Sequence, residues 1–334
     1  MSADADQITF PGLDRGCAPL GVGTWAWGDK STWGMGGYDA AITEATIAEA
    51  FEASLAAGVT LFDTAEVYGG GESERIIGRL LSASGVARDD LVLATKFMPA
   101  PWKLNVKGAL RSALQASLER LGVERVDLYQ IHGPVSLRSH GALADALAAV
   151  VDEGLASAVG VSNYSVKEME AIHTDLAGSG VALASNQIEF SILRRRPETS
   201  GLIAACRRLG VVPLAYSPIG QGRLTGKYSA SNPPPSSRTF SAHPMAQVDP
   251  IVAELRRIGE AHAAGGDART PSQVALRWLI QKGAVPIPGA KNAEQAEQNA
   301  GALGWALSAD DMAGIDALAL EGLRSLKSRV WQHG

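Results

Sequence analysis

The strongest constraint on the fold is a set of eight short apolar segments that alternate with stretches of helical periodicity. These predicted strands cover residues 18–23, 60–65, 91–97, 126–132, 157–163, 184–190, 211–219 and 284–290. Strands that alternate with helices predict βαβ units and a parallel sheet. Eight units within 334 residues, without a break in composition, favour a closed α/β barrel of the (β/α)8 TIM type over two doubly wound domains. We expect one barrel domain over residues 1–334, with residues 322–334 as a C-terminal tail.

Three segments lie outside this alternation. Residues 8–21 predict an N-terminal hairpin that closes the floor of the barrel. Long loops, residues 24–40 and 220–247, follow the first and seventh strands. Loops at that end of a barrel carry the active site, and loops of this length usually cover a ligand or are disordered. The three tryptophans of the first loop argue for order there.

Composition excludes several classes of partner. The net charge of −5 and the pI near 5.7 give no basic surface for nucleic acid. No apolar run approaches the length that spans a membrane, and the acidic N-terminus resembles no targeting peptide. The two cysteines, Cys17 and Cys206, have no metal or redox spacing, which fits a reducing, cytoplasmic location. The six histidines show no metal-ligand spacing, so we expect no metal; the oligomeric state stays open.

Ionisable residues gather near the ends of neighbouring predicted strands. Asp63 lies in the second strand, Lys96 in the third and His132 at the end of the fourth, and Tyr68 follows the second strand. Inward-pointing side chains alternate along barrel strands, so these groups meet at one rim. A buried Asp–Lys pair could be purely structural, since pairing offsets the cost of burying each charge. Four such groups together favour a catalytic site over that alternative.

Proton donation is the chemistry that this set of residues suggests. A free tyrosine, with a pKa of about 10, is a weak acid, and a neighbouring ammonium group lowers that pKa. We therefore expect Lys96 to make Tyr68 more acidic, and Asp63 to hold Lys96 charged. His132 would donate a hydrogen bond to a substrate carbonyl. Such a site protonates the oxygen of a carbonyl group while its carbon accepts hydride.

Seven stretches resemble the signature sequences of the aldo-keto reductases, in the same order and at similar separations. They are LFDTAEVYGGGESE (61–74), ATKF (94–97), LYQIH (128–132), GVSNYS (160–165), NQIEFS (186–191), YSPIGQGRLTGKY (216–228) and VPIPGAKNAEQAEQN (285–299). The resemblance implies a barrel that reduces an aldehyde or ketone with NADPH and lacks a Rossmann domain. Consistent with this, no G-x-G-x-x-G motif follows a predicted strand.

The resemblance also implies a role for each matching residue. Tyr68 becomes the general acid, assisted by the other three rim residues, while Tyr216 stacks on the nicotinamide ring. Residues 217–224 match a loop that lies along the pyrophosphate. The implied cofactor contacts are Gly23, Thr24, Ser162, Asn163, Gln187, Tyr216, Ser217, Pro218, Gly220, Gly222, Leu224, Gly289, Lys291, Gln295, Gln298 and Asn299.

Lys291 also has a direct interpretation. It precedes a predicted helix whose N-cap is Asn292, with Gln295 completing a capping box. A cation at a helix N-terminus opposes the helix dipole unless an anion lies there, and helix N-termini bind phosphate. We therefore assign Lys291 to the 2′-phosphate of NADPH, which predicts a preference for NADPH over NADH.

Within the family, residues 23–28, 101–102 and 301–305 resemble pyridoxal reductase-like members. This suggests pyridoxal or another aromatic aldehyde as substrate, with a pocket lined by Trp25, Trp27, Trp102 and the loop 133–140. Two other functions stay open. One is a barrel aldolase with Lys96 as its Schiff-base lysine, and the other is a nucleotide-binding regulatory subunit of the same fold.

Overall fold

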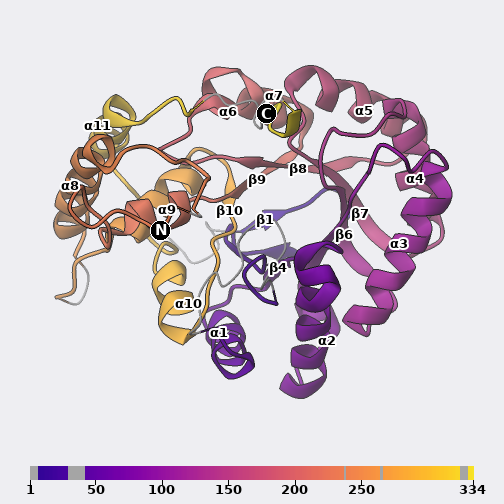
Figure 1. The fold of residues 1–334 in the computed structure, drawn as a ribbon, viewed down its shortest axis with the longest axis horizontal. Helices are drawn as coiled ribbons and strands as arrows, with labels where there is room; N and C mark the ends of the chain where they lie inside the picture. The colour runs from indigo at the N-terminus through magenta and orange to yellow at the C-terminus, as the bar shows by residue number, and fades with distance from the viewer. Residues whose placement is uncertain (1–6, 29–41, 237, 264–265, 324–329) are drawn as a thin grey trace.

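The computed structural model describes residues 7–28, 42–236, 238–263, 266–323 and 330–334. Eight parallel strands form one sheet at the centre, and helices surround it (Figure 1). The strands follow one another in chain order around the sheet, from β3 to β10. The predicted (β/α)8 barrel is thus confirmed.

The elements fall close to the predicted segments. The barrel strands are β3 (Gly21–Gly23), β4 (Leu61–Asp63), β5 (Val92–Phe97), β6 (Val126–Ile131), β7 (Ala156–Ser162), β8 (Leu183–Glu189), β9 (Val212–Tyr216) and β10 (Val285–Pro286). The α-helices are α1 (Glu44–Ala56), α2 (Glu72–Ser84), α3 (Val106–Leu121), α4 (His140–Asp152), α5 (Val166–Gly178), α6 (Arg196–Thr199), α7 (Leu202–Leu209), α8 (Met245–Ala261), α9 (Pro271–Gln281), α10 (Ala293–Ala300) and α11 (Ala309–Leu318). Short 3-10 helices are η3 (Tyr68–Gly71), η4 (Arg88–Asp90) and η5 (Gly220–Thr225).

The barrel closes between its first and last strands. The Gly23 N–H donates to the Pro288 carbonyl at 3.0 Å, just past the end of β10. A Cβ at position 23 would lie 2.7 Å from the Ile287 carbonyl oxygen, so glycine is required for this close approach. Helices α1 and α10, from opposite ends of the chain, consequently lie side by side over the seam (Figure 1).

The floor of the barrel is sealed by the predicted N-terminal hairpin. Strands β1 (Ile8–Thr9) and β2 (Gly16–Cys17) pair antiparallel, and Phe10 between them is 1% exposed. Phe10 and Cys17 pack against the inward side chains of the barrel, among them Leu61, Val92, Leu128, Leu214 and Val285. This apolar plug fills the lower interior, so the open end is the one at the C-termini of the strands.

A buried carboxylate, that of Asp127, joins the floor hairpin to two neighbouring segments of the barrel. Asp127, near the start of β6, is 1% exposed and is paired with the guanidinium groups of Arg15 and Arg88. Its second oxygen also accepts from the Leu93 N–H at 2.8 Å. The Asp127 charge is therefore fully paired.

The long loop after β9 lies over the mouth of the barrel, as predicted, and includes η5. Of the loop after β3, residues 29–41 lie outside the described residues, and so do residues 324–329 of the predicted tail. The described end of the tail, residues 330–334, lies at the mouth, since Val330 and Trp331 line its cavity.

Candidate active site

Tyr68, Lys96 and Asp63 form a hydrogen-bonded chain at the mouth. Lys96, on β5, lies in the middle, with its Nζ 2.5 Å from Asp63 Oδ1 and 3.3 Å from the Tyr68 hydroxyl. Its Nζ also donates to the Thr64 carbonyl at 2.7 Å. His132 follows β6 and meets the Tyr68 ring edge-on, with centroids 5.6 Å apart. Asp63, Tyr68 and His132 line one cavity, and Lys96 lies directly behind them.

Two glutamines complete the surroundings of Asp63. Gln130 Nε2 donates to Asp63 Oδ2 at 3.2 Å, and Gln187 Nε2 donates to the same oxygen at 2.8 Å. The side chains of Lys96 and Asp63 are 0% and 2% exposed. A desolvated ion pair is tolerated when hydrogen bonds satisfy its remaining atoms, and these amides do so for the carboxylate.

The expected acidification of Tyr68 is not found, and that expectation is wrong for this site. Burial raises the pKa of Tyr68 well above its usual value of 10.0, and the Asp63 charge raises it further. Burial also lowers the pKa of Lys96, against the opposing effect of Asp63. Desolvation outweighs the ammonium–phenol contact because the phenolate is the form that most needs water. Tyr68 therefore keeps its proton at neutral pH.

His132 is neutral for the same reason. Burial lowers its pKa well below 6.5, and the Lys96 charge lowers it further. Its Nδ1 is buried and has no hydrogen-bond partner among the described residues. A neutral imidazole has one N–H donor, so His132 can donate a hydrogen bond to a neighbouring oxygen without carrying charge.

One end of the cavity, here called the amide end, consists of Ser162, Asn163, Gln187 and Tyr216. The Asn163 amide donates to Ser162 Oγ at 3.0 Å, and its carbonyl accepts from the Tyr216 hydroxyl at 2.8 Å. Ser162 Oγ donates to the Gln187 backbone carbonyl at 2.9 Å. The strand ends β7, β8 and β9 thus present linked amides and one aromatic ring beside Asp63, Tyr68 and His132.

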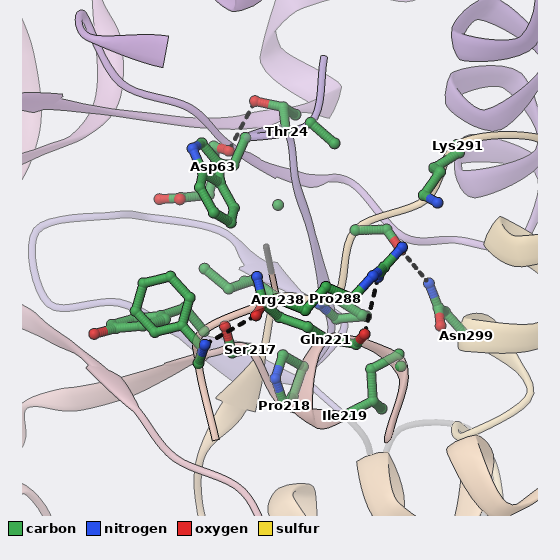
Figure 2. Close-up of a pocket in the computed structure, with 18 of the residues that line it drawn as sticks. Thr24, Asp63, Ser217, Pro218, Ile219, Gln221, Arg238, Pro288, Lys291 and Asn299 are labelled. Atoms are coloured by element: carbon green, nitrogen blue, oxygen red, sulfur yellow. Dashed lines mark hydrogen bonds between the residues drawn. The ribbon is translucent and has the colours of Figure 1, made fainter. Parts of the chain in front are cut away.

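The other end, here called the cationic end, carries Lys291 and Arg238. Figure 2 shows both with Gln221 and Asn299 around the same space. Arg238 donates to the Gln221 carbonyl at 2.9 Å, and Asn299 donates to the Gly289 carbonyl at 3.3 Å. Asn292 caps α10 by accepting from the Gln295 N–H, but Gln295 accepts from the Lys291 N–H, so only half of the predicted capping box forms.

Backbone strain is concentrated around this cavity. The described non-glycine residues with positive φ are Asn163, Ser217, Gln221 and Ser241. The first three line the cavity, and Ser241 donates a hydrogen bond to Glu189. Left-handed backbone in residues with side chains costs free energy and is commonly retained at functional sites.

Most of the residues expected to contact a cofactor line the cavity. They are Gly23, Thr24, Ser162, Asn163, Gln187, Tyr216, Ser217, Pro218, Gly222, Gly289, Lys291, Gln295, Gln298 and Asn299. Gly220 and Leu224 do not; both are buried, and Leu224 belongs to the hydrophobic core.

The predicted substrate pocket needs correction. Trp25 lines the cavity and meets the Phe240 ring edge-on at 5.9 Å. Trp27 is fully buried and donates to the Ala290 carbonyl at 2.8 Å, so it packs between barrel and helices instead. Trp102 is 80% exposed beyond the rim, and none of residues 133–140 lines the cavity.

Sequence reasoning missed several residues of the site. Gln130 had a signal, because it lies two positions before His132 and therefore on the same side of β6. Arg238, Phe240 and Trp331 had none, because they come from irregular segments without periodicity.

A (β/α)8 barrel with Tyr, Lys, Asp and His together at its mouth is the arrangement expected from the resemblance to the aldo-keto reductases. Residues 19–320 match the model of the aldo/keto reductase family. The chain is 36% identical to the chloroplastic pyridoxal reductase of Arabidopsis thaliana, over 94% of this chain and 87% of the relative. The protein therefore belongs to the aldo/keto reductase family, and it is an oxidoreductase.

Solved structures agree. The glycerol dehydrogenase of Gluconobacter oxydans superposes with a TM-score of 0.79 at 26% identity, covering 100% of this chain and 98% of that one. An aldo-keto reductase from Klebsiella pneumoniae in complex with NADPH gives 0.74 at 25% identity, covering 96% of each chain. Among the described residues, no helix is long and apolar enough to cross a membrane. The same residues contain no cluster of three potential metal ligands.

Proposed function

We propose that the protein reduces an aldehyde or ketone with NADPH, and that Tyr68 donates the proton. The observation that carries the proposal is the Asp63–Lys96–Tyr68 chain beside His132, at the edge of a cavity of about 780 Å³. Cavities of this size hold cofactors and small ligands. The family supports carbonyl chemistry, and the Klebsiella pneumoniae relative that binds NADPH supports the choice of cofactor.

The donor set fits a nicotinamide dinucleotide phosphate. The amide end offers groups that suit a carboxamide, with the Tyr216 ring beside them, and the cationic end suits phosphates. Gln221 lines the same cavity, and its side-chain nitrogen is buried without a partner among the described residues. A phosphate oxygen would satisfy that donor. When bound, the cofactor supplies the hydride for the carbonyl carbon.

The protein residues control the proton and the position of the substrate. The neutral His132 donates a hydrogen bond to the carbonyl oxygen and fixes its position near Tyr68. Tyr68 transfers its proton to that oxygen as negative charge develops there. Lys96, 3.3 Å from the Tyr68 hydroxyl, stabilises the resulting phenolate, and Asp63 holds the ammonium in place. The high pKa of Tyr68 keeps the proton available until the oxygen becomes basic enough to take it.

We infer an aromatic aldehyde such as pyridoxal as the substrate class. The Arabidopsis thaliana relative is a pyridoxal reductase, and aromatic side chains surround the catalytic residues here. Trp25, Phe240 and Trp331 contribute to the cavity wall. Planar rings pack well against such walls.

The test is the loss of absorbance of NADPH with a panel of aldehydes that includes pyridoxal. Tyr68→Phe is the matched variant, since it removes one hydroxyl and keeps the ring. We expect it to bind NADPH normally and to lose turnover by about 10²–10⁴-fold, the usual contribution of a general acid. Near wild-type turnover in Tyr68→Phe would remove Tyr68 from this role.

Borohydride treatment with the same aldehydes separates this proposal from the aldolase alternative. A Schiff-base enzyme would be trapped as a covalent adduct on Lys96, whereas we expect the mass of the protein to stay unchanged. A regulatory subunit would bind NADPH but oxidise it with none of the aldehydes.

A further inference from the structure

Residues 330–334 lie against the amide end of the cavity. Val330 and Trp331 line the cavity, and the Trp331 ring meets the His132 ring with centroids 5.6 Å apart. Gln332 Nε2 donates to the Tyr216 hydroxyl at 3.1 Å and is also hydrogen-bonded to the Glu189 carboxylate. The segment is thus in direct contact with a residue to which we assign a cofactor contact.

The Tyr216 hydroxyl is held from two sides. It accepts a hydrogen bond from Gln332 and donates one to Asn163 Oδ1 at 2.8 Å. Asn163 is itself held by the same segment, because the His333 backbone N–H donates to the Asn163 carbonyl at 3.1 Å. Asn163 has a φ of 65°, so this bond supports a strained position. Two neighbouring residues of the segment therefore hold two residues of the amide end.

Gln332 is in turn oriented by a buried carboxylate. Glu189, at the end of β8, is 4% exposed, and Ser241 donates to its other oxygen at 2.8 Å. Arg194 Nε lies 3.8 Å from the carboxylate. The carboxylate fixes which end of the Gln332 amide faces Tyr216, because only the nitrogen end can donate to it.

We propose that Gln332 is a positioning residue for hydride transfer: it holds the Tyr216 ring in place, so that residues 330–334 help to position the nicotinamide. The proposal rests on the proposed function and deepens it. A ring that is bonded at its hydroxyl from two sides cannot tilt away from the cavity. Loss of the Gln332 bond would let the Tyr216 ring and Asn163 shift together, and the reacting carbon with them.

Gln332→Met tests the proposal, because methionine has a similar length and donates no hydrogen bond. We expect kcat with an aldehyde that the wild type reduces to fall about tenfold, the size expected for one lost hydrogen bond at a reacting group. The fluorescence of bound NADPH should also change, since it reports the surroundings of the nicotinamide. The affinity for adenosine 2′,5′-bisphosphate, which carries no nicotinamide, should stay unchanged. Gln332→Asn, with a shorter amide, should give an intermediate kcat.

His333→Ala is the matched control. It removes the side-chain contact with Glu168, 2.8 Å long and partly exposed, but keeps the backbone bond to Asn163. We expect its kcat to stay within about twofold of wild type, because partly exposed ion pairs contribute little. Wild-type kcat and fluorescence in Gln332→Met would overturn the proposal, and so would an equal loss of adenosine bisphosphate affinity, which would indicate general distortion. A wild-type protein that reduces no aldehyde would instead overturn the proposed function.

Discussion

The two ends of the barrel each contain a buried carboxylate, but the cations paired with these carboxylates differ in their exposure to solvent. At the floor, Asp127 is paired with Arg15 and Arg88, whose side chains are about one quarter exposed. At the mouth, Asp63 is paired with Lys96, which is 0% exposed and contacts a phenol that opens onto a cavity. Strand β6 carries Asp127 near its start and is followed by His132 at its other end, whereas Arg15 and Arg88 come from segments outside the barrel strands.

The residues at the floor stabilise the fold, whereas those at the mouth cost stability and suit binding or catalysis. At the floor Asp127 is buried, but both of its arginine partners keep partial contact with water, which lowers the desolvation cost of the group, so these contacts can stabilise the fold. Around the mouth lie a fully desolvated ion pair, Lys96 with Asp63, and the strained backbone of Asn163, Ser217 and Gln221. Such features cost stability and are retained where binding or catalysis uses them.

The largest expected effect on stability is at the floor. Asp127→Asn should lower the free energy of unfolding by about 2–3 kcal/mol, because two arginines lose their partner while keeping some contact with water. The kcat of the folded variant should equal that of wild type. Denaturant unfolding and steady-state kinetics measure the two quantities.

Asp145→Asn is the control for this prediction, since Asp145 is exposed on α4 and its loss should change neither quantity. Tyr68→Phe should have the opposite effect: it should lose turnover and keep the free energy of unfolding of the wild type. A stable but inactive Asp127→Asn protein would contradict the division between the two ends.

A smaller effect is expected at the cationic end. Lys291→Ala should lower the ratio of kcat/KM with NADPH to that with NADH about tenfold, because one charge-assisted contact to the 2′-phosphate is lost while Arg238 stays. Thermal unfolding without ligand should be unchanged. Lys107→Ala, on the exposed side of α3, is the control. An unchanged cofactor preference would count against the role of Lys291.

The smallest effect is expected from pH. Carbonyl reduction needs a neutral His132 and a protonated Tyr68, and the pKa of His132 lies well below 6.5 while that of Tyr68 lies well above 10.0. Activity should therefore be lost only in acid, as His132 gains a proton, and in alkali. The pKa of Lys96 is lowered from 10.5, so the alkaline loss should report Lys96 losing its proton before Tyr68 does.

Between about pH 7 and 9 we expect kcat/KM to change less than about twofold. Rates of substrate reduction across this range measure it. An alkaline loss that begins near pH 7 would contradict this prediction, because a group that the reaction needs would then titrate in the neutral range. Asp127→Asn should leave the profile unchanged.

The sequence predicted the barrel because strand periodicity and helix signals recur eight times. The predicted strands were too long at their ends: residues 18–20 lie before β3, and residues 64–65, 217–219 and 287–290 lie after β4, β9 and β10. Apolar composition could not distinguish residues that are hydrogen-bonded in the sheet from the apolar residues on either side of a strand. The floor hairpin was predictable from the turn residues Pro11 and Gly12.

The sequence predicted the position of site residues that lie on or next to strands, but not of those that lie in loops. Alternation along β4, β5 and β6 brings Asp63, Lys96 and His132 to one rim. The direction of the Tyr68 pKa shift depends on desolvation, which composition and spacing do not report. Trp102 was misplaced because a loop tryptophan has no period that fixes its direction.

The seam of the barrel has a consequence for the protein in the cell. Gly23 from the first strand and Pro288 beyond the last one are joined by a single backbone hydrogen bond, and both border the cavity. A molecule bound in the cavity would contact both sides of this seam and would therefore stabilise the closed barrel. A ligand that binds only the closed form stabilises it by mass action. When that ligand is scarce, we expect proteases to cleave the chain first at the seam between β3 and β10.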